Sequence, residues 1–125
     1  MPAAATQTPQ PEATHQQELA ALDQLIAREL APRITAIDLE GEYPEAFLRA
    51  LGQQGGYAGV VDAAWGGNGQ GLAHTIQIMS RVGESCLSTA FAVWCQTACA
   101  RYLQLSDNEA LQQEFLPGLS DPLIR

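Results

Sequence analysis

Apolar side chains return every three or four residues along most of this sequence, and this spacing constrains the fold more than any other feature. It places the apolar groups on one face of a helix. The longest series has six members, spaced 4, 3, 4, 4 and 3 residues apart: Leu87, Phe91, Trp94, Ala98, Tyr102 and Leu105. No stretch shows the strict alternation typical of a half-buried strand. The sequence therefore predicts an all-α chain, a bundle of about five helices.

Residues that start or stop helices set the limits of these five elements. Pro32 should end or kink the first, because proline lacks an amide hydrogen and collides with the preceding turn. Pro44 is suited to the first position of the second helix. Ser106 and Glu109 have the capping-box spacing and should open the last, which Pro117 then stops. The expected helices lie within 16–31, 44–52, 72–84, 86–105 and 106–116.

The chain has 125 residues, which is one domain at most. Residues 1–15 hold Ala, Thr, Gln and Pro without periodic apolar positions, so we expect a disordered leader. Residues 16–119 form the expected helical domain, and 120–125 are expected to be a tail without structure of its own. Residues 38–42 are expected to be an acidic connector between helices.

The charge balance excludes some partners. Fourteen acidic residues face six arginines and no lysine, for a net charge of −8. Such a chain repels a phosphate backbone and an anionic membrane surface, so neither nucleic acid nor a membrane is an expected partner. There is no apolar stretch of about 20 residues and no basic, apolar signal segment at the start. Together with unpaired cysteines, this favours a cytoplasmic location.

The three cysteines, Cys86, Cys95 and Cys99, are expected to be buried, inert thiols rather than metal ligands. A metal site needs further ligands, and His15 and His74 do not stand at a ligand spacing. No metal site is therefore predicted. His74 is expected to be a solvated helix residue, because it lies away from the apolar positions of its helix.

A loop over residues 65–71 holds four glycines in seven positions and leads directly into a helix. Exposed amides ahead of a helix can bind a phosphate. The loop lacks the G-x-G-x-x-G and G-K-[ST] patterns, however, and no βαβ unit surrounds it. A tight structural turn is the favoured interpretation.

Other polar groups have a structural interpretation beside a functional one. Glu84 could act as a general base, but a helix-end salt bridge with Arg81 is the commoner arrangement. Trp94 could line a ligand pocket, although a core position is favoured at helical spacing. A group of carboxylates could hold a cation, but a solvated connector is the commoner case: Asp38, Glu40, Glu42 and Glu45. None of these residues identifies a reaction.

Four short motifs follow one another: an aromatic-proline helix start with a Leu-x-x-x-Gly end, an aromatic-Gly-Gly-x-Gly loop, a glutamate at a helix junction, and a closing Leu-Pro. They are Tyr43-Pro44 with Leu51 to Gly55, Trp65 to Gly69, Glu84 with Ser88-Thr89-Ala90, and Asn108-Glu109 with Phe115-Leu116-Pro117. In this order and spacing they resemble the N-terminal helical domain of the acyl-CoA dehydrogenase family. The resemblance covers roughly residues 16–119.

The sequence also departs from the family pattern. Asp62-Ala63-Ala64 stands where Pro-Glu-Glu is frequent, Glu84 is a single glutamate preceded by Gly83, and Asp107 replaces a common glycine. These departures indicate a divergent member, and a flavin-dependent monooxygenase of the same fold stays open as an alternative.

The resemblance implies an FAD-dependent oxidoreductase of fatty acid metabolism, acting on acyl-CoA as a homo-oligomer. The α-proton of the thioester is removed and a hydride passes from the β-carbon to the flavin. In the family, a β-domain with most flavin contacts and a later helical bundle with the catalytic base follow this domain. We therefore expect a fragment in which residues 120–125 start a missing β-domain, and in which no residue is catalytic and no FAD is held.

The resemblance also implies that this domain forms one wall of the acyl pocket. By register, the helix over 86–105 would present four residues to the acyl chain: Phe91, Trp94, Cys95 and Ala98. A third possibility, from another functional class, is a free-standing helical binding or assembly module without catalysis.

Overall fold

The computed structural model describes residues 11–119, and this part of the chain consists of helices joined by turns and short irregular segments, without any strand. The α-helices are α1 (Pro11–Leu25), α2 (Ile34–Glu40), α3 (Glu45–Gln53), α4 (Leu72–Gly83), α5 (Leu87–Leu105) and α6 (Glu109–Leu119). The all-α prediction is confirmed. Residues 1–10 of the expected leader and the expected tail over 120–125 lie outside the described residues, and the division into domains stays a prediction.

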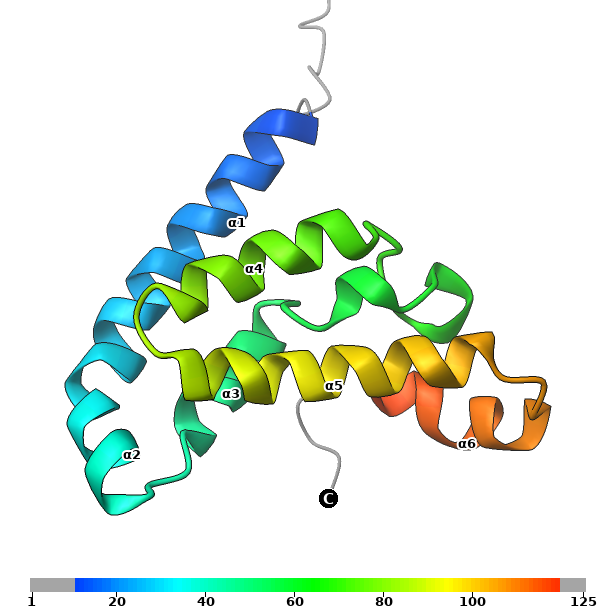
Figure 1. Ribbon diagram of the computed structural model, residues 1–125. Coiled ribbons are helices and arrows are strands. Elements are labelled where there is room, and N and C mark those ends of the chain that lie inside the picture. The colour runs from blue at the N-terminus through cyan, green and yellow to red at the C-terminus, as the bar shows by residue number, and fades with distance from the viewer. Residues whose placement is uncertain (1–10, 120–125) are drawn as a thin grey trace, which may run out of the picture.

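The helix α5 is the central element of the fold, because both α4 and α6 pack against it. Figure 1 shows α4 lying antiparallel along it after the short 84–86 connection, with α6 folded back beneath its C-terminal half. α1 leans across the other end, where it contacts both α3 and α4. The irregular segment between α3 and α4 contains two short 3-10 turns, Ala58–Val60 and Ala63–Trp65.

The first helix differs from the prediction at its start and agrees with it at its other end. α1 begins at Pro11, so residues 11–15, assigned to the leader, are helical; proline at a first helical position loses no hydrogen bond. The predicted kink at Pro32 is confirmed, because the regular helix gives way before this proline. A π-turn over Ile26–Leu30 and a 3-10 turn over Ala31–Arg33 absorb the missing amide.

Beyond that bend the chain continues as α2, which ends at Gly41 with a left-handed φ of 69°. Asp38 and Glu40 therefore lie on a helix, and the prediction of a connector over 38–42 was wrong for its first three residues. These residues are helical because Ile37, on the inner side of α2, is buried in the apolar core and stabilises this helix.

The last helix begins later than predicted, at Glu109 rather than Ser106, and it also ends later. α6 continues through Pro117 to Leu119, although the sequence indicates a stop at Pro117. Leu116 and Leu119 are both buried under α5. Burying two leucines contributes about 1.5–3 kcal/mol each, which matches or exceeds the cost of about 3 kcal/mol for an interior proline.

Two apolar clusters form the core, and α5 contributes to both. The larger cluster takes Ala90 and Val93 from its N-terminal half. The smaller takes Ala100 from its C-terminal half, packed with Leu116 and Leu119 of α6. The other buried members of the larger cluster come from α1 to α4 and their connections: Leu22, Leu25, Ile26, Leu30, Ile37, Phe47, Leu48, Leu51, Tyr57, Ile78, Val82 and Cys86. One side of α5 is therefore buried against the core along most of its length.

Candidate functional site

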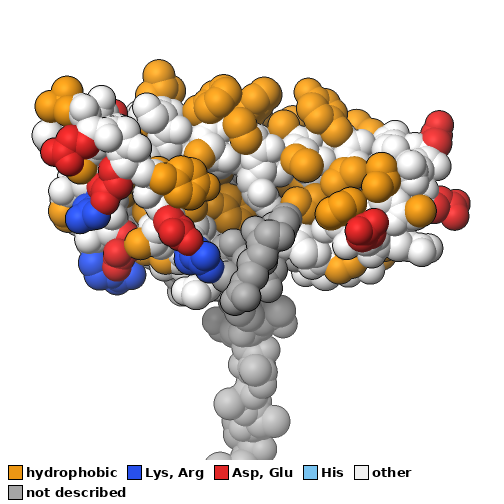
Figure 2. Space-filling view, turned by 90° about the horizontal axis from the view of Figure 1, so that it is seen from below, with side chains coloured by type: hydrophobic (Ala, Val, Ile, Leu, Met, Phe, Trp, Pro, Cys, Tyr) orange, Lys and Arg blue, Asp and Glu red, His pale blue; other side chains and the backbone are white. Residues whose placement is uncertain are grey.

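The outer side of α5 carries exposed aromatic side chains. Phe91 is 62% exposed and Trp94 45% exposed, and their rings stack with centroids 5.5 Å apart and an interplanar angle of 28°. Figure 2, seen from below, shows apolar side chains spread along the length of α5 and α6, with the visible arginines gathered toward the α2 end. The core interpretation of Trp94 therefore does not fit the structure.

The four residues predicted to face an acyl chain share this outer side of α5. Their spacing of 3, 1 and 3 residues puts them on one face of the helix. Phe91, Trp94 and Cys95 are exposed and Ala98 is half-buried. The structure brings them together as a surface, and their role as a pocket wall stays a prediction.

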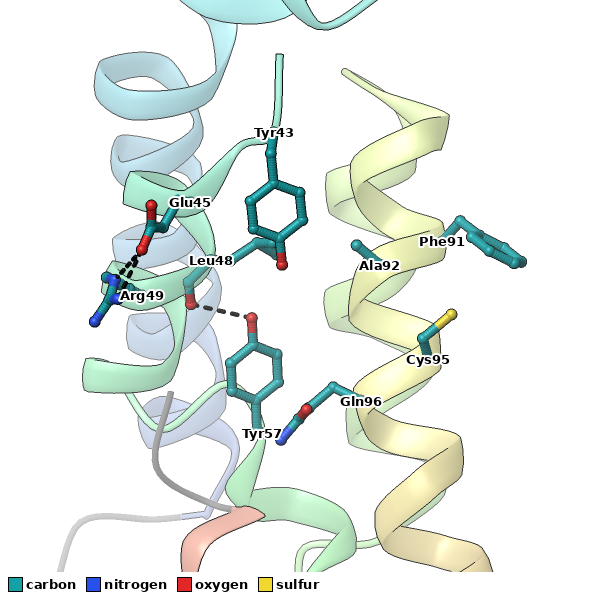
Figure 3. Close-up of a pocket in the computed structure, with 9 residues that line it drawn as sticks. All are labelled: Tyr43, Glu45, Leu48, Arg49, Tyr57, Phe91, Ala92, Cys95 and Gln96. Atoms are coloured by element: carbon teal, nitrogen blue, oxygen red, sulfur yellow. Dashed lines mark hydrogen bonds and ion pairs between the residues drawn. The ribbon is translucent and has the colours of Figure 1, made fainter. Parts of the chain in front are cut away.

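A cavity of about 590 Å³ opens between α3 and α5, within the usual range of small-molecule sites. Figure 3 shows the rings of Tyr43 and Tyr57 in the space between the two helices, whereas Phe91 and Cys95 point away from α3. Trp94 and Ala98 do not line it. The other lining residues are Glu45, Leu48, Arg49, Ala92 and Gln96.

Three of the polar side chains that line this cavity, Tyr57, Arg49 and Glu45, are already engaged within the protein. The Tyr57 hydroxyl donates to the Leu48 carbonyl oxygen at 3.0 Å, and burial, with a smaller contribution from Tyr43, raises the pKa of Tyr57 far above its ordinary value of 10.0. At the rim, the Arg49 guanidinium donates to Glu45 Oε1 from Nη2 at 2.6 Å and from Nε at 2.9 Å. The lining offers aromatic and aliphatic surface, not a base.

The glycine-rich loop is a structural turn. Its six backbone amides, from Gly66 to Gly71, all donate within the protein, five to backbone carbonyls and one to the Asn68 side chain. Gly67 lies so close to the 60–62 segment that a Cβ there would be 1.9 Å from the Val61 carbonyl oxygen. No amide of this loop is left to cradle a phosphate, which supports the tight-turn interpretation.

Glu84 does not form the expected ion pair. It follows α4 in an exposed position, while the Arg81 guanidinium lies 3.2 Å from the carboxylate of Asp23 on α1. The prediction of an Arg81–Glu84 pair was wrong, because α1 crosses α4 on the side to which Arg81 points. An exposed Glu84 is also not a buried general base.

His74 is not the solvated residue that the sequence indicates, because its side chain is only 10% exposed. Its Nε2 lies 3.3 Å from Glu18 Oε2, and its Nδ1 lies 3.0 Å from Nδ1 of His15. Burial lowers the pKa of His74, and His15 lowers it further, while Glu18 acts in the opposite direction. The prediction was wrong because the start of α1 covers this side of α4.

Cysteine burial follows the two sides of α5. Cys86, before the helix, is buried as expected, and Thr89 Oγ1 donates to its sulfur at 3.1 Å. Cys95 and Cys99 are exposed, so their expected burial was wrong. Both stand on the side of α5 that no other described element covers.

Two glutamines that the sequence did not single out, Gln104 and Gln112, connect α5 and α6 to neighbouring backbone. The Asp62 amide donates to Gln104 Oε1 at 2.8 Å, and Gln104 Nε2 donates to the Val60 carbonyl oxygen. Gln112 Nε2 donates to carbonyl oxygens at the end of α5, those of Leu103 at 3.0 Å and Ser106 at 2.7 Å. The sequence offers only a weak signal for these two glutamines, namely a polar residue on the side of a helix that faces another helix.

The chain is similar to known proteins over nearly all of its described length. The family model for the acyl-CoA dehydrogenase N-terminal domain matches residues 12–121. A cyclohex-1-ene-1-carbonyl-CoA dehydrogenase of Syntrophus aciditrophicus (strain SB) is 27% identical over 97 residues, which cover 78% of this chain but only 23% of that protein. No solved structure matches significantly. No helix in residues 11–119 is long and apolar enough to cross a membrane.

Proposed function

The chain belongs to the acyl-CoA dehydrogenase family through its N-terminal domain, and on that premise we propose that it is the N-terminal part of an FAD-dependent acyl-CoA dehydrogenase whose acyl pocket it helps to line. The observation that carries this proposal is the stacked pair Phe91 and Trp94 on the uncovered side of α5. Exposed aromatic surface of this kind is typical of a binding site or an interface. The proposed ligand of this surface is the acyl group of the thioester.

The charges of the chain favour the acyl end of the substrate over its phosphate-bearing end. The net charge is −8, which opposes a polyanion. Four of the five arginines among the described residues already face a carboxylate: Arg28 with Glu29, Arg33 with Glu42, Arg49 with Glu45, and Arg81 with Asp23. The coenzyme A phosphates are therefore proposed to bind to other parts of the complete protein.

FAD enters this proposal as the hydride acceptor of the complete enzyme. The described residues do not fit the group by themselves, because the amides of the loop from Gly66 to Gly71 are all engaged within the protein. The proposal therefore assigns the flavin contacts to the part of the enzyme beyond this domain. The role of residues 11–119 is to present apolar surface.

Substitution of Trp94 in the complete protein tests the proposal. Trp94→Ala should move the preference toward longer or bulkier acyl groups by about tenfold in kcat/KM, since one methylene in an apolar pocket changes discrimination by about 10–200-fold. The control is Leu39→Ala, an exposed leucine on α2, which should leave the acyl profile unchanged. An unchanged acyl-chain preference of Trp94→Ala would refute the role of Trp94 in the pocket wall. If the unsubstituted protein is a soluble monomer that does not bind acyl-CoA, a binding module is favoured instead.

A further inference from the structure

Three side chains with metal-binding atoms meet where α1 crosses α4. His15 and Glu18 stand three residues apart on α1, and His74 comes from the first turns of α4. One nitrogen of each histidine and one carboxylate oxygen all lie within 4.8 Å of one another. The two histidine rings are in contact, with centroids 4.9 Å apart. The three residues are half-buried, so the group faces both helices and an opening to solvent.

The donor set is the kind that a zinc ion takes. Two imidazole nitrogens and one carboxylate oxygen bind Zn²⁺ and leave a fourth position for water. The Nδ1 atoms of His15 and His74 are 3.0 Å apart. Two ligand atoms at 2.0–2.1 Å from a tetrahedral ion are about 3.3 Å apart, so the observed separation is slightly shorter than this distance.

The surroundings of the group resemble those of a ligand shell. The side-chain oxygen of Gln77 lies within hydrogen-bond distance of His15 Nε2, and ligating histidines commonly engage their second nitrogen in this way. A cavity of about 390 Å³, lined by Thr14, Gln70 and Gln77 together with both histidines, opens onto the group. The cavity provides an entry path and room for a water ligand.

The protein alone leaves one of these atoms unsatisfied. Glu18 Oε2 is buried and has no hydrogen-bond partner in the structure, although it lies 3.3 Å from His74 Nε2. A buried carboxylate oxygen without a hydrogen bond is costly. A cation held among the three side chains would offset the charge of this carboxylate.

We propose that His15, Glu18 and His74 bind a divalent transition-metal ion of the zinc class, and that the ion clamps the start of α1 to α4. The site lies away from the cavity between α3 and α5 and from the outer side of α5, so it does not depend on the proposed acyl pocket. Its effect is on the docking of α1, a helix that the larger core cluster needs through Leu22 and Leu25.

Isothermal titration of the 125-residue chain with Zn²⁺ tests the site. Cys95 and Cys99 are exposed, four residues apart on α5, and could take up zinc themselves. The titration therefore starts from the Cys95→Ser, Cys99→Ser variant, and one ion per chain is expected. In that background His74→Gln and Glu18→Gln should each weaken zinc binding by about 10–100-fold or more. Loss of a residue that only orients a metal ligand already has an effect of about this size.

Controls and a second readout keep the outcome unambiguous. Glu84→Gln, an exposed carboxylate after α4, should leave the affinity unchanged. Zn²⁺ should raise the melting temperature of the Cys95→Ser, Cys99→Ser variant, since an ion that binds only the folded state stabilises it. Adding His15→Gln to that variant should abolish this rise. His15 lies near the start of α1, so we expect this variant to keep its fold even if His74→Gln does not. No zinc binding by the cysteine-free chain, or equal affinity in all variants, would overturn the proposal.

Discussion

Tyr57 ties the segment after α3 back onto that helix, because its hydroxyl donates to the backbone carbonyl oxygen of Leu48 at 3.0 Å. Both residues are buried, at 5% and 9% exposure, and both line the cavity between α3 and α5. Both residues also belong to the larger core cluster, so the bond joins two parts of the chain where that cluster meets the cavity. It also makes Tyr57 a sensitive probe of whether this part of the chain is folded.

Removing this hydroxyl should weaken the fold. Tyr57→Phe loses one buried hydrogen bond, so the free energy of unfolding in urea should fall by about 1 kcal/mol. The matched control is Tyr102→Phe, because Tyr102 is 70% exposed and surface changes stay within about 0.5 kcal/mol. Equal losses in the two variants would contradict a specific role for the Tyr57 bond.

Tyr57 should also make the fold sensitive to alkali. Burial raises the pKa of the folded Tyr57 phenol, while the unfolded residue ionises near pH 10. The unfolded state therefore loses its proton first, so this contribution to stability is complete below about pH 10 and is lost as the pH rises beyond it. Tyrosinate absorbance measures this directly. Tyr57 should ionise only on unfolding; its ionisation near pH 10 in the folded protein would refute the expectation.

The glycine at position 67 should resist substitution. A Cβ there would lie 1.9 Å from the Val61 carbonyl oxygen, so Gly67→Ala should cost about 3 kcal/mol of unfolding free energy through overpacking. Gly69 is the control, with open space around its Cβ position and a φ of 62°. Gly69→Ala should cost only the left-handed backbone penalty of about 1–2 kcal/mol. Similar losses at both positions would mean that the close approach is relieved cheaply.

The uncovered side of α5 should make the chain self-associate. Exposed apolar patches of several hundred Å² drive association, and the charge of −8 opposes it without removing the patch. We expect a helical circular dichroism spectrum, a broad melting transition and binding of hydrophobic dyes. Replacing Phe91 and Trp94 by Gln should reduce dye binding and the sedimentation mass, whereas Leu39→Gln should not. A sharply melting monomer that ignores such dyes would contradict this expectation.

The 125-residue chain should purify without flavin. The amides of the loop from Gly66 to Gly71 already donate within the protein, and a flavin site needs several convergent polar groups. Absorbance of the purified chain in the flavin region, before and after incubation with FAD and gel filtration, measures this. Stoichiometric retention of FAD would contradict this expectation.

Most of the helices could be predicted from the sequence because their signals are local. The apolar series and terminal residues predict α3, α4 and α5 to within about two residues of the ranges observed. The glycine-rich loop was likewise predictable, since only a turn tolerates so many glycines between helices. Four motifs in family order were enough for the family, because they depend on order and spacing alone.

The tertiary structure decided which surfaces meet. Periodicity shows that Phe91 and Trp94 share a helix face, but only the packing of α4 and α6 on the opposite face leaves that pair exposed. In the same way His15 and His74 are 59 residues apart and carry no mutual spacing signal. They meet because α1 begins at Pro11 and crosses α4. A side chain's helix is set by its neighbours in sequence, whereas its burial and its partners are set by the helix that covers it.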